Sequence, residues 1–314
     1  MTPDKPLAPK PFVSHREYKR SVSSTAAAWF KAKGLAVSPK YPYCLESRDK
    51  WADNIIVPKV AEFVEDECKA RNARRQSFAL HKYVHHGLSS QAMLFNLVGP
   101  LIVREDLEPL QAALTEAGVP WPAGTVKASL ETEDRLMFKE GQGQPTSIDL
   151  VLEGEAPPTL FIEAKFVEQN FGGCSVFENG DCSGSNPART PSSCYLQRIG
   201  RTYWEKLQQL GFLQPAMTDG PICPLANYYQ FFREIVFALA KGGEFVLLFD
   251  RRSPVFYRPV DGADAGLMAF LSTFVPQKHM SHVRAISIQE IAASIRHSGR
   301  HNDWIGDFEE KYGL

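Results

Sequence analysis

The stretch that decides the fold reads SIDLVL over residues 147–152 and, after a short break, TLFIEAKFV over residues 159–167. Both segments are mostly apolar and rich in residues that favour strands, and turn-forming residues lie before, between and after them. Runs of this length with such borders are typical of buried β-strands. The sequence therefore predicts two neighbouring strands at the centre of the fold.

Three charged residues interrupt these apolar strands. Asp149 lies in the first strand, and Glu163 and Lys165 lie in the second. Because side chains alternate along a strand, Glu163 and Lys165 share one face with Phe161. Charged groups on buried strands cost free energy unless they are paired or bind something, so these three residues form a candidate site. The alternative is an ordinary strand with an exposed Glu and Lys.

An Asp on one strand and a Glu-x-Lys on the next suit metal-dependent hydrolysis of phosphodiester bonds. Carboxylates on adjacent strands can hold a hard cation such as Mg²⁺ and leave positions for water and a phosphate oxygen. The lysine lies on the same face, where it can orient or activate the attacking water and offset charge in the transition state.

This pattern resembles the PD-(D/E)xK nuclease superfamily, which has the restriction-endonuclease-like fold. The resemblance implies that Asp149 and Glu163 bind Mg²⁺ (or Mn²⁺) and that Lys165 is the catalytic lysine. Ile148 stands where the motif has proline, a departure that the superfamily often tolerates. The wider chain also looks like a bacterial group of this superfamily that has a Ser-Ser-Gln-Ala helix before the core, here at residues 89–92.

The helix before the core is expected to support the site. In many members of the superfamily such a helix supplies an acid or an amide. The candidates here are Gln91 and Asn96, while Glu62 and Glu65 lie further away along the chain. The sequence does not choose between them.

The helix after the core carries Gln230, Arg233 and Glu234 on one polar face. Gln230 with Arg233 resembles the Gln-bearing helix of exonuclease-like members, which positions substrate phosphate or the lysine. The alternative is that these residues form the polar outer face of a core helix.

The order of elements favours an α/β fold: a restriction-endonuclease-like mixed β-sheet core flanked by helices, with an N-terminal helical extension and a Cys-rich insertion. We expect an N-terminal tail and helical extension over residues 1–85 and the nuclease-like core over residues 86–314. Residues 1–14 are expected to be a disordered or loosely docked tail. Hydrophobic periodicity predicts helices at residues 15–33, 58–75, 90–101, 107–117, 196–210, 225–239, 264–274 and 289–296, and further strands at 126–138, 244–249, 255–257 and 283–288.

Charge and composition limit the partners. Lys and Arg (35) nearly balance Asp and Glu (36) among the 314 residues, so no global basic field favours nucleic acid, and binding needs a local basic surface. We find no signal peptide and no apolar segment long enough to span a bilayer, which predicts a cytoplasmic protein without membrane contact. The sequence leaves the oligomeric state open, a homodimer included. The arginines from which a basic surface would be drawn are Arg71, Arg74, Arg75, Arg198, Arg201, Arg251 and Arg252.

The Gly-, Ser- and Cys-rich loop at residues 170–194 is too long to be a simple connection. It contains Cys174, Cys182 and Cys194, and Cys223 follows between two helices. Four thiolates suit tetrahedral Zn²⁺, and an iron–sulfur cluster also uses four cysteines. Separate buried or surface thiols are the alternative, because no close Cys-x-x-Cys pair is present.

The sequence thus favours a Mg²⁺-dependent nuclease that hydrolyses phosphodiester bonds of DNA. The second hypothesis is a non-catalytic nuclease-like or zinc-stabilised module that binds nucleic acid or a protein. The complete set of Asp149, Glu163 and Lys165 argues against it, because a decayed site has no reason to keep all three. A different metal-dependent hydrolase is disfavoured because no His-based metal motif is present.

Overall fold

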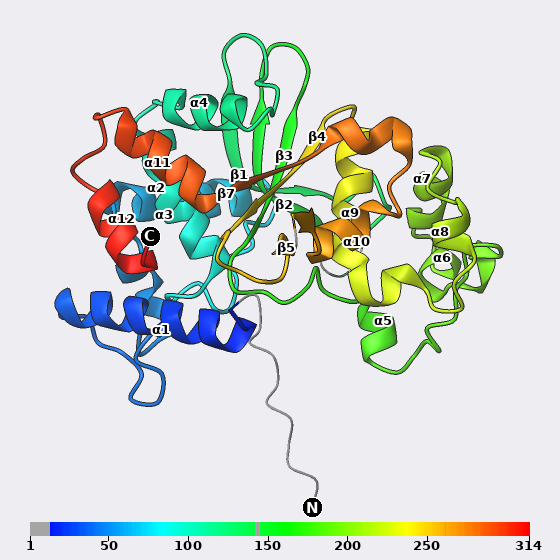
Figure 1. Cartoon of the computed structure of the whole chain (residues 1–314), viewed down its shortest axis with the longest axis horizontal. Helices are drawn as coiled ribbons and strands as arrows, with labels where there is room; N and C mark the ends of the chain where they lie inside the picture. The colour runs from blue at the N-terminus through cyan, green and yellow to red at the C-terminus, as the bar shows by residue number, and fades with distance from the viewer. Residues whose placement is uncertain (1–12, 142, 144, 261) are drawn as a thin grey trace, which may run out of the picture.

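The computed structural model has a five-stranded mixed sheet between two layers of helices (Figure 1). It describes residues 13–141, 143, 145–260 and 262–314. The predicted α/β class with a mixed sheet flanked by helices is confirmed. Most of the predicted tail, residues 1–12, lies outside the described residues.

The sheet has the strand order β1-β2-β3-β4-β7. The first three strands are antiparallel neighbours, whereas β3, β4 and β7 run parallel. Every residue of β3 and β4 is buried, which explains their nearly continuous apolar runs. The strands are β1 (Lys127–Asp134), β2 (Thr146–Glu153), β3 (Leu160–Lys165), β4 (Glu244–Phe249) and β7 (Val283–Ser287).

One helical layer contains both ends of the described chain and packs on the face of β3 that carries Ile162 and Ala164. Its central helix, α3 (Ser90–Val103), is buried along nearly its whole length and contacts β3 directly. α1 packs against α12, so the first and last helices lie side by side on the left of Figure 1. The other members of this layer are α1 (His15–Ala32), η1 (Arg48–Asn54), α2 (Pro58–Ala73), α4 (Glu108–Glu116), α11 (Ile288–His297) and α12 (Ile305–Tyr312).

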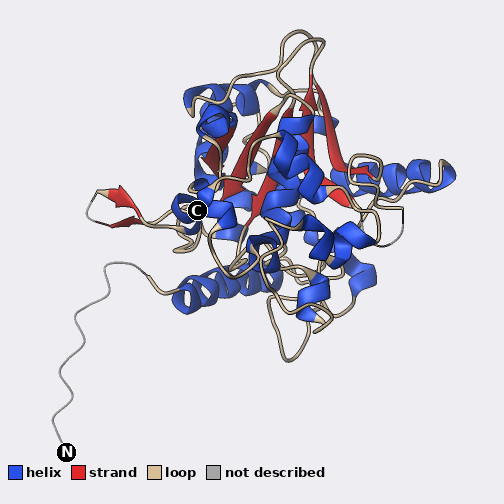
Figure 2. Cartoon of the chain, turned by 90° about the vertical axis from the view of Figure 1, so that its right-hand side faces the viewer, coloured by secondary structure: helices blue, strands red, loops and turns tan. Residues whose placement is uncertain are grey.

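The second layer packs on the opposite face, which carries Phe161. Its main helix, α9 (Pro224–Ala240), contacts β4 and β2 and lies to the right of the sheet in Figure 1. A small hairpin of β5 (Pro259–Val260) and β6 (Ala263–Asp264) stands away from the body of the molecule (Figure 2). The remaining elements are α5 (Ser175–Glu178), η2 (Pro191–Ser193), α6 (Tyr195–Arg198), α7 (Tyr203–Gln209), α8 (Pro215–Thr218), α10 (Leu267–Ser272) and η3 (Gln277–His282).

Local sequence explains where the main helices begin. The side chain of Ser14 accepts a hydrogen bond from the Glu17 amide, and the Glu17 carboxylate accepts one from the Ser14 amide, which forms a capping box. The Ser89 side chain caps α3 by accepting a hydrogen bond from the Ala92 amide. α1 is followed by Gly34, whose φ of 67° lies in the left-handed region that favours glycine.

Three predicted elements are wrong in part. Residues 255–257 form a turn, not a strand, because their carbonyls accept from the amides of Leu267 and Met268 at the start of α10. The helix predicted over residues 264–274 is limited to α10, since Asp264 closes the hairpin and accepts from the Gly266 amide. The single helix predicted over residues 196–210 is two helices, α6 and α7, interrupted at Gly200, which has a φ of 87°.

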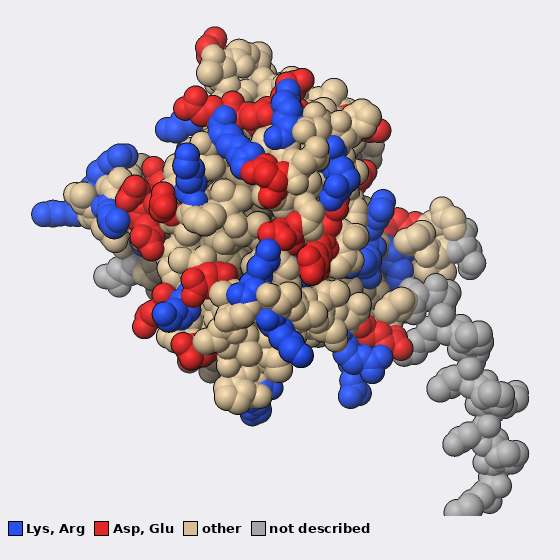
Figure 3. All heavy atoms as spheres, turned by 90° about the vertical axis from the view of Figure 1, so that its left-hand side faces the viewer, with Lys and Arg blue, Asp and Glu red and all other residues tan. Residues whose placement is uncertain are grey.

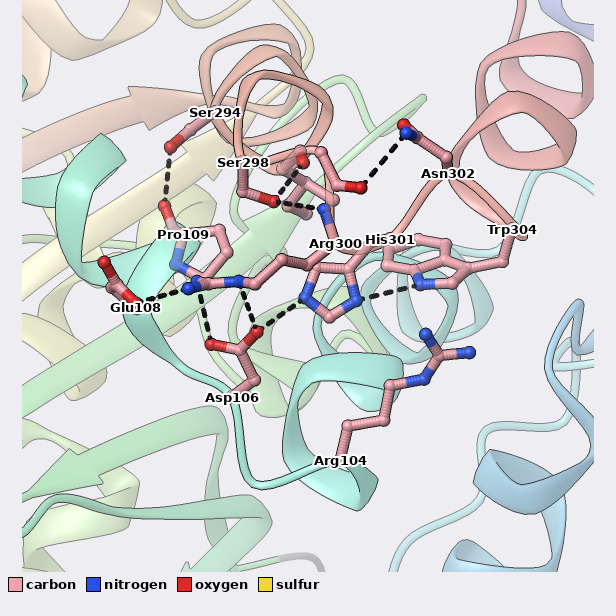
Figure 4. Close-up of polar contacts among 12 residues, drawn as sticks. Arg104, Asp106, Glu108, Pro109, Ser294, Ser298, Arg300, His301, Asn302 and Trp304 are labelled. Atoms are coloured by element: carbon pink, nitrogen blue, oxygen red, sulfur yellow. Dashed lines mark hydrogen bonds and ion pairs between the residues drawn. The ribbon is translucent and has the colours of Figure 1, made fainter.

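A polar network joins the connection between α3 and α4 to the one between α11 and α12 (Figure 4). The carboxylate of Asp106 accepts from Arg300 and lies 3.0 Å from Nε2 of the buried His301. The indole of Trp304, which can only donate, points its N–H at Nδ1 of His301, 3.3 Å away. Nδ1 therefore acts as an acceptor, which leaves Nε2 to donate to Asp106. This network fixes the C-terminal helices to the layer that covers β3.

No helix in the described part of the chain is long and apolar enough to cross a membrane.

Candidate active site

Three carboxylates occupy consecutive positions across neighbouring strands. Leu130 of β1 is paired with Leu150 of β2, which is paired with Ile162 of β3. The next residue in the same direction on each strand is Glu131, Asp149 and Glu163. Strand register therefore brings the predicted Asp149 and Glu163 together and adds a third acid.

Asp149 lies where the pairing between β2 and β3 ends. Beyond the Leu150–Ile162 pair, the Asp149 side chain accepts the backbone N–H of Ala164, 2.8 Å from Oδ2. Burial, followed by the charges of Glu163 and Glu131, raises the pKa of Asp149 well above its ordinary value. The carboxylate is thus held between strands in a position where its negative charge is unfavourable.

Glu163, Lys165 and Gln230 form a closed triangle of hydrogen bonds. The Lys165 Nζ lies 2.6 Å from Glu163 Oε1 and 2.9 Å from Gln230 Oε1, and Gln230 Nε2 donates to the same Glu163 oxygen over 2.7 Å. Glu163 and Lys165 are only 2% and 5% exposed. Burial lowers the pKa of Lys165, but the nearby carboxylates, Glu163 first, outweigh it and raise that pKa overall, so the lysine is a cation.

Glu131 is a site residue that the sequence reasoning missed. Its buried carboxylate accepts from Gln91 Nε2 at 2.7 Å and from the Ser147 hydroxyl at 3.3 Å. Its backbone φ of 49° is unusual for a glutamate, and Arg71 donates to the carbonyls of Leu130 and Glu131 there. Burial and then the charge of Glu163 raise the pKa of Glu131 to about 7. The register of β1 on β2 places Glu131 opposite Asp149, so knowledge of this register would have predicted Glu131 as part of the site.

Glu234 is a fourth buried acid beside this group. It is on α9, one turn after Gln230, and it is fully buried. Burial and then the charge of Glu163 raise its pKa well above the ordinary value. Glu234 shares the predicted polar face of this helix with Gln230, and its spacing of one turn from Gln230 was a usable signal for a role in the site.

The donor set suits a divalent cation. The acids that act on Lys165 are Glu163, Glu234, Glu168 and Asp149, and Glu131 lies beside Glu163 and Asp149. The site therefore carries more negative than positive charge, and such a group needs protons or a cation. Glu163 Oε2 is buried and makes no hydrogen bond in the described part of the chain, which leaves this oxygen open to a cation. Oxygen donors of this kind are the ligands that Mg²⁺ prefers. Among the described residues, no three His, Cys, Asp or Glu side chains converge closely enough to hold a metal ion. The candidate side-chain ligands are therefore two, Asp149 and Glu163, and the other ligands of a cation would be waters or phosphate oxygens.

The structure separates the other predicted supporting residues. Gln91 reaches the acids through Glu131, and its other contacts are the Ala79 carbonyl and the His81 amide. Asn96 is directed away and bonds to Asn54, Ile56 and Tyr312 in the helical layer.

Glu62 and Glu65 lie elsewhere, on the wall of an open cavity of about 430 Å³ that Trp29 and Asp307 also line. Arg233 is one turn from Gln230 but its guanidinium lies 4.0 Å from Glu140 and over the ring of Tyr229. It therefore does not bond to Glu163 or Lys165.

The four cysteines of the predicted metal site lie in one region at the start of α9. The Cys174 amide donates to the Ala226 carbonyl, and the Cys223 amide donates to the Gly184 carbonyl. Burial raises the pKa of Cys223 to about 12, and the nearby Cys194 and Cys174 add to the increase. A Zn²⁺ or iron–sulfur site of Cys174, Cys182, Cys194 and Cys223 stays a prediction, which metal analysis of the purified protein tests.

The predicted basic residues differ in their surroundings. Arg71 bonds to backbone carbonyls of β1, and Arg252 bonds to Asp250 and to the carbonyls of Tyr312 and Gly313, so both hold the fold together. The exposed arginines of the set are Arg74, Arg75, Arg198 and Arg251. Figure 3 shows basic and acidic side chains interspersed on the face that carries the C-terminal helices, without a large area of one sign.

A family model identifies the family to which the chain belongs. Residues 23–313 match the family model described as Restriction Endonuclease associating with ARP. The chain belongs to this family. The match confirms the predicted restriction-endonuclease-like relationship over nearly the whole chain and indicates a nuclease-like function with a nucleic-acid substrate. No curated protein and no solved structure matches the chain.

Proposed function

We propose that this member of the restriction endonuclease family is a PD-(D/E)xK nuclease that hydrolyses phosphodiester bonds of DNA with Mg²⁺ or Mn²⁺. Asp149 and Glu163 are the proposed cation ligands, and Lys165 is the proposed catalytic lysine. The observation that carries the proposal is the juxtaposition of these residues: Asp149 next to Glu163 across β2 and β3, and Lys165 2.6 Å from Glu163.

Each residue has a definite task in this proposal. When bound, the divalent cation supplies Lewis acidity and stabilises negative charge on the phosphate. Asp149 and Glu163 hold it, and the Ala164 amide fixes the orientation of Asp149. Lys165 stays protonated beside these acids, where its ammonium orients the attacking water and offsets charge on the phosphate. Gln230 holds Lys165 and Glu163 at a fixed separation.

Cleavage assays with Lys165→Ala test the proposal. The wild-type protein is expected to degrade DNA with Mg²⁺ or Mn²⁺ and to lose this activity in EDTA. Lys165→Ala should lower the cleavage rate by roughly 10²- to 10³-fold, the usual cost of removing one donor that stabilises charge in the transition state. Circular dichroism and the unfolding temperature check that the variant is folded. Wild-type protein that binds DNA or RNA but cleaves neither with either metal would instead favour a non-catalytic nucleic-acid-binding module.

The first turns of α1 offer a surface for the DNA backbone. Arg16, Lys19 and Arg20 are exposed at helical spacing on one face of α1. The buried face of the same helix is fixed next to the site, because Tyr18 donates to the Phe166 carbonyl and His15 bonds to the Val167 carbonyl. Phe166 and Val167 directly follow Lys165 in the chain. Three cations beside the proposed site can contact phosphates along a bound strand.

Replacing Arg16, Lys19 and Arg20 together with glutamine is expected to weaken DNA binding. Each lost phosphate contact should reduce the slope of log affinity against log salt concentration by about 0.9. Fluorescence anisotropy over a salt series measures this slope, in a Lys165→Ala background so that no DNA is cut.

Lys31→Gln is the matched control, since Lys31 is exposed on the same helix but about 22 Å from Arg16 along its axis. An unchanged salt slope in the triple variant would place the DNA on another surface.

A further inference from the structure

Glu234 is the acid of the site whose contacts are least satisfied. Its side chain is 0% exposed, and neither carboxylate oxygen has a donor at hydrogen-bond distance in the described part of the chain, although the Gln230 amide lies near enough to lower its pKa slightly against the effect of burial. Leaving a buried acid without partners costs more free energy than a single intramolecular hydrogen bond contributes. No other carboxylate among the described residues has both oxygens buried and without a partner. We therefore expect that Glu234 has a partner in another state of the protein and that it has a role in that state.

Lys165 is the cation available to pair with Glu234. The charged groups that act on Glu234 are Glu163, Lys165 and Arg233, and Arg233 is directed at Glu140. The neutral amide of Gln230 is also close, but its Nε2 donates to Glu163. Lys165 uses two of its three N–H groups, on Glu163 and Gln230, and its third has no acceptor in the described part of the chain. Lys165 thus has one N–H group without an acceptor, and it lies near the Glu234 carboxylate, which has no donor at hydrogen-bond distance.

Glu163 has two tasks in the proposed reaction. Its Oε1 accepts from both Lys165 and Gln230, and the proposed function also assigns it a cation. A divalent cation at Glu163 withdraws negative charge from that carboxylate and repels the nearby ammonium. Lys165 then needs a second acid to remain oriented in a buried site.

We propose that Glu234 is a positioning residue that pairs with Lys165 when a divalent cation occupies Glu163. It keeps the ammonium directed at the water and the phosphate while Glu163 serves the cation. This inference rests on the proposed function and adds a residue that the Asp149, Glu163 and Lys165 pattern does not include.

Glu234→Gln tests the proposal, because the amide keeps the size of the side chain and removes the charge. The variant should lower kcat by about 10- to 100-fold, the usual effect of removing a group that orients a functional residue. The KM for DNA and the Mn²⁺ affinity, measured by titration calorimetry, should stay within about threefold of wild type. Glu234→Asp, which keeps the charge, should recover part of the lost kcat. An unchanged kcat, or a loss of Mn²⁺ affinity that would make Glu234 a cation ligand, overturns the proposal.

Glu244→Gln is the matched control. Glu244 is also buried and has one unpartnered oxygen, but it lies at the opposite end of β4 from the site, where it bonds to His282. Both substitutions remove a buried carboxylate, so a kcat loss confined to Glu234→Gln is not a general effect on stability. An equal loss in the two variants overturns the proposal.

A readout without catalysis separates this inference from the proposed function. The ammonium protons of Lys165 give a separate NMR signal only while they are protected from exchange with water. In the wild type this signal should persist when Mg²⁺ is added, whereas in Glu234→Gln it should be lost. Its persistence in the variant overturns the pairing, whether or not the protein cleaves DNA. Inactive wild-type protein with the expected signals would contradict only the proposed function.

Discussion

Asp149→Asn is expected to abolish cleavage and, at the same time, to stabilise the fold in the absence of divalent cations. The amide still accepts the hydrogen bond from the Ala164 amide, so the strand geometry is retained. The substitution removes one charge from a buried group that also contains Glu131 and Glu163, whose repulsion opposes ionisation of Asp149. The free energy of unfolding in EDTA should therefore rise by about 1–2 kcal/mol.

The loss of activity has a separate cause. A cation that is no longer held by Asp149 cannot stabilise charge on the phosphate, a contribution of several kcal/mol or about 10³-fold in rate. Denaturant unfolding and cleavage assays measure the two effects. Addition of Mg²⁺ should raise the unfolding temperature of the wild type but not of the variant, because binding to the native state alone stabilises it. A variant that is less stable than wild type in EDTA would contradict the charge argument.

The strands of the site were predictable because their signals are local. The two apolar runs around Asp149 and Glu163 read as strands from length and composition, and the Glu-x-Lys spacing put both charges on one face. Both of these inferences need only residues near one another in the sequence. Gln230 is different, because only the resemblance of its helix to the Gln-bearing helix of exonuclease-like members suggested it, and its contacts with Lys165 and Glu163 are long-range.

Glu131 and the surroundings of Arg233 were not predictable in this way. Glu131 joins the site through the register of β1 on β2 and a left-handed backbone conformation, neither of which the sequence specifies locally. Arg233 shares a helix face with Gln230, yet the buried Glu140 from the chain between β1 and β2 attracts it. Residues 255–257 resemble a strand in sequence because all three are apolar, and they are buried or half-buried, whereas their backbone bonds to the start of α10. In all three places, contacts between residues distant in the sequence determine the structure.

Lys311 on α12 is buried without any acidic partner. Its side chain is 0% exposed and forms no ion pair in the described part of the chain. It donates to the backbone carbonyl and to Oδ1 of Asn54, and it lies 4.5 Å from the centre of the Trp29 ring. A ring contact of this kind contributes about 0.5–2 kcal/mol, less than the several kcal/mol that burial of an ion costs. Burial therefore lowers the pKa of Lys311 well below its ordinary value of 10.5.

The lowered pKa makes stability depend on pH. The unfolded chain holds the Lys311 proton up to pH 10.5, whereas the folded protein releases it at a lower pH. Between the folded and the unfolded pKa the unfolded state binds more protons, so the free energy of unfolding rises with pH by up to about 1.4 kcal/mol per unit. Below the folded pKa and above 10.5 this contribution is constant. Lys311→Met removes it.

Denaturant unfolding of the wild type and of Lys311→Met from pH 6 to 10.5 tests this expectation. Other titrating groups contribute equally to both proteins, so the wild-type free energy minus the variant's isolates Lys311 and should increase with pH. Lys31→Met is the control, because Lys31 is exposed and its difference from the wild type should stay flat. A flat difference for Lys311→Met as well would mean that Asn54 and the aromatic rings compensate fully for burial. The charge on Lys311 would then have no net cost where α12 contacts Asn54.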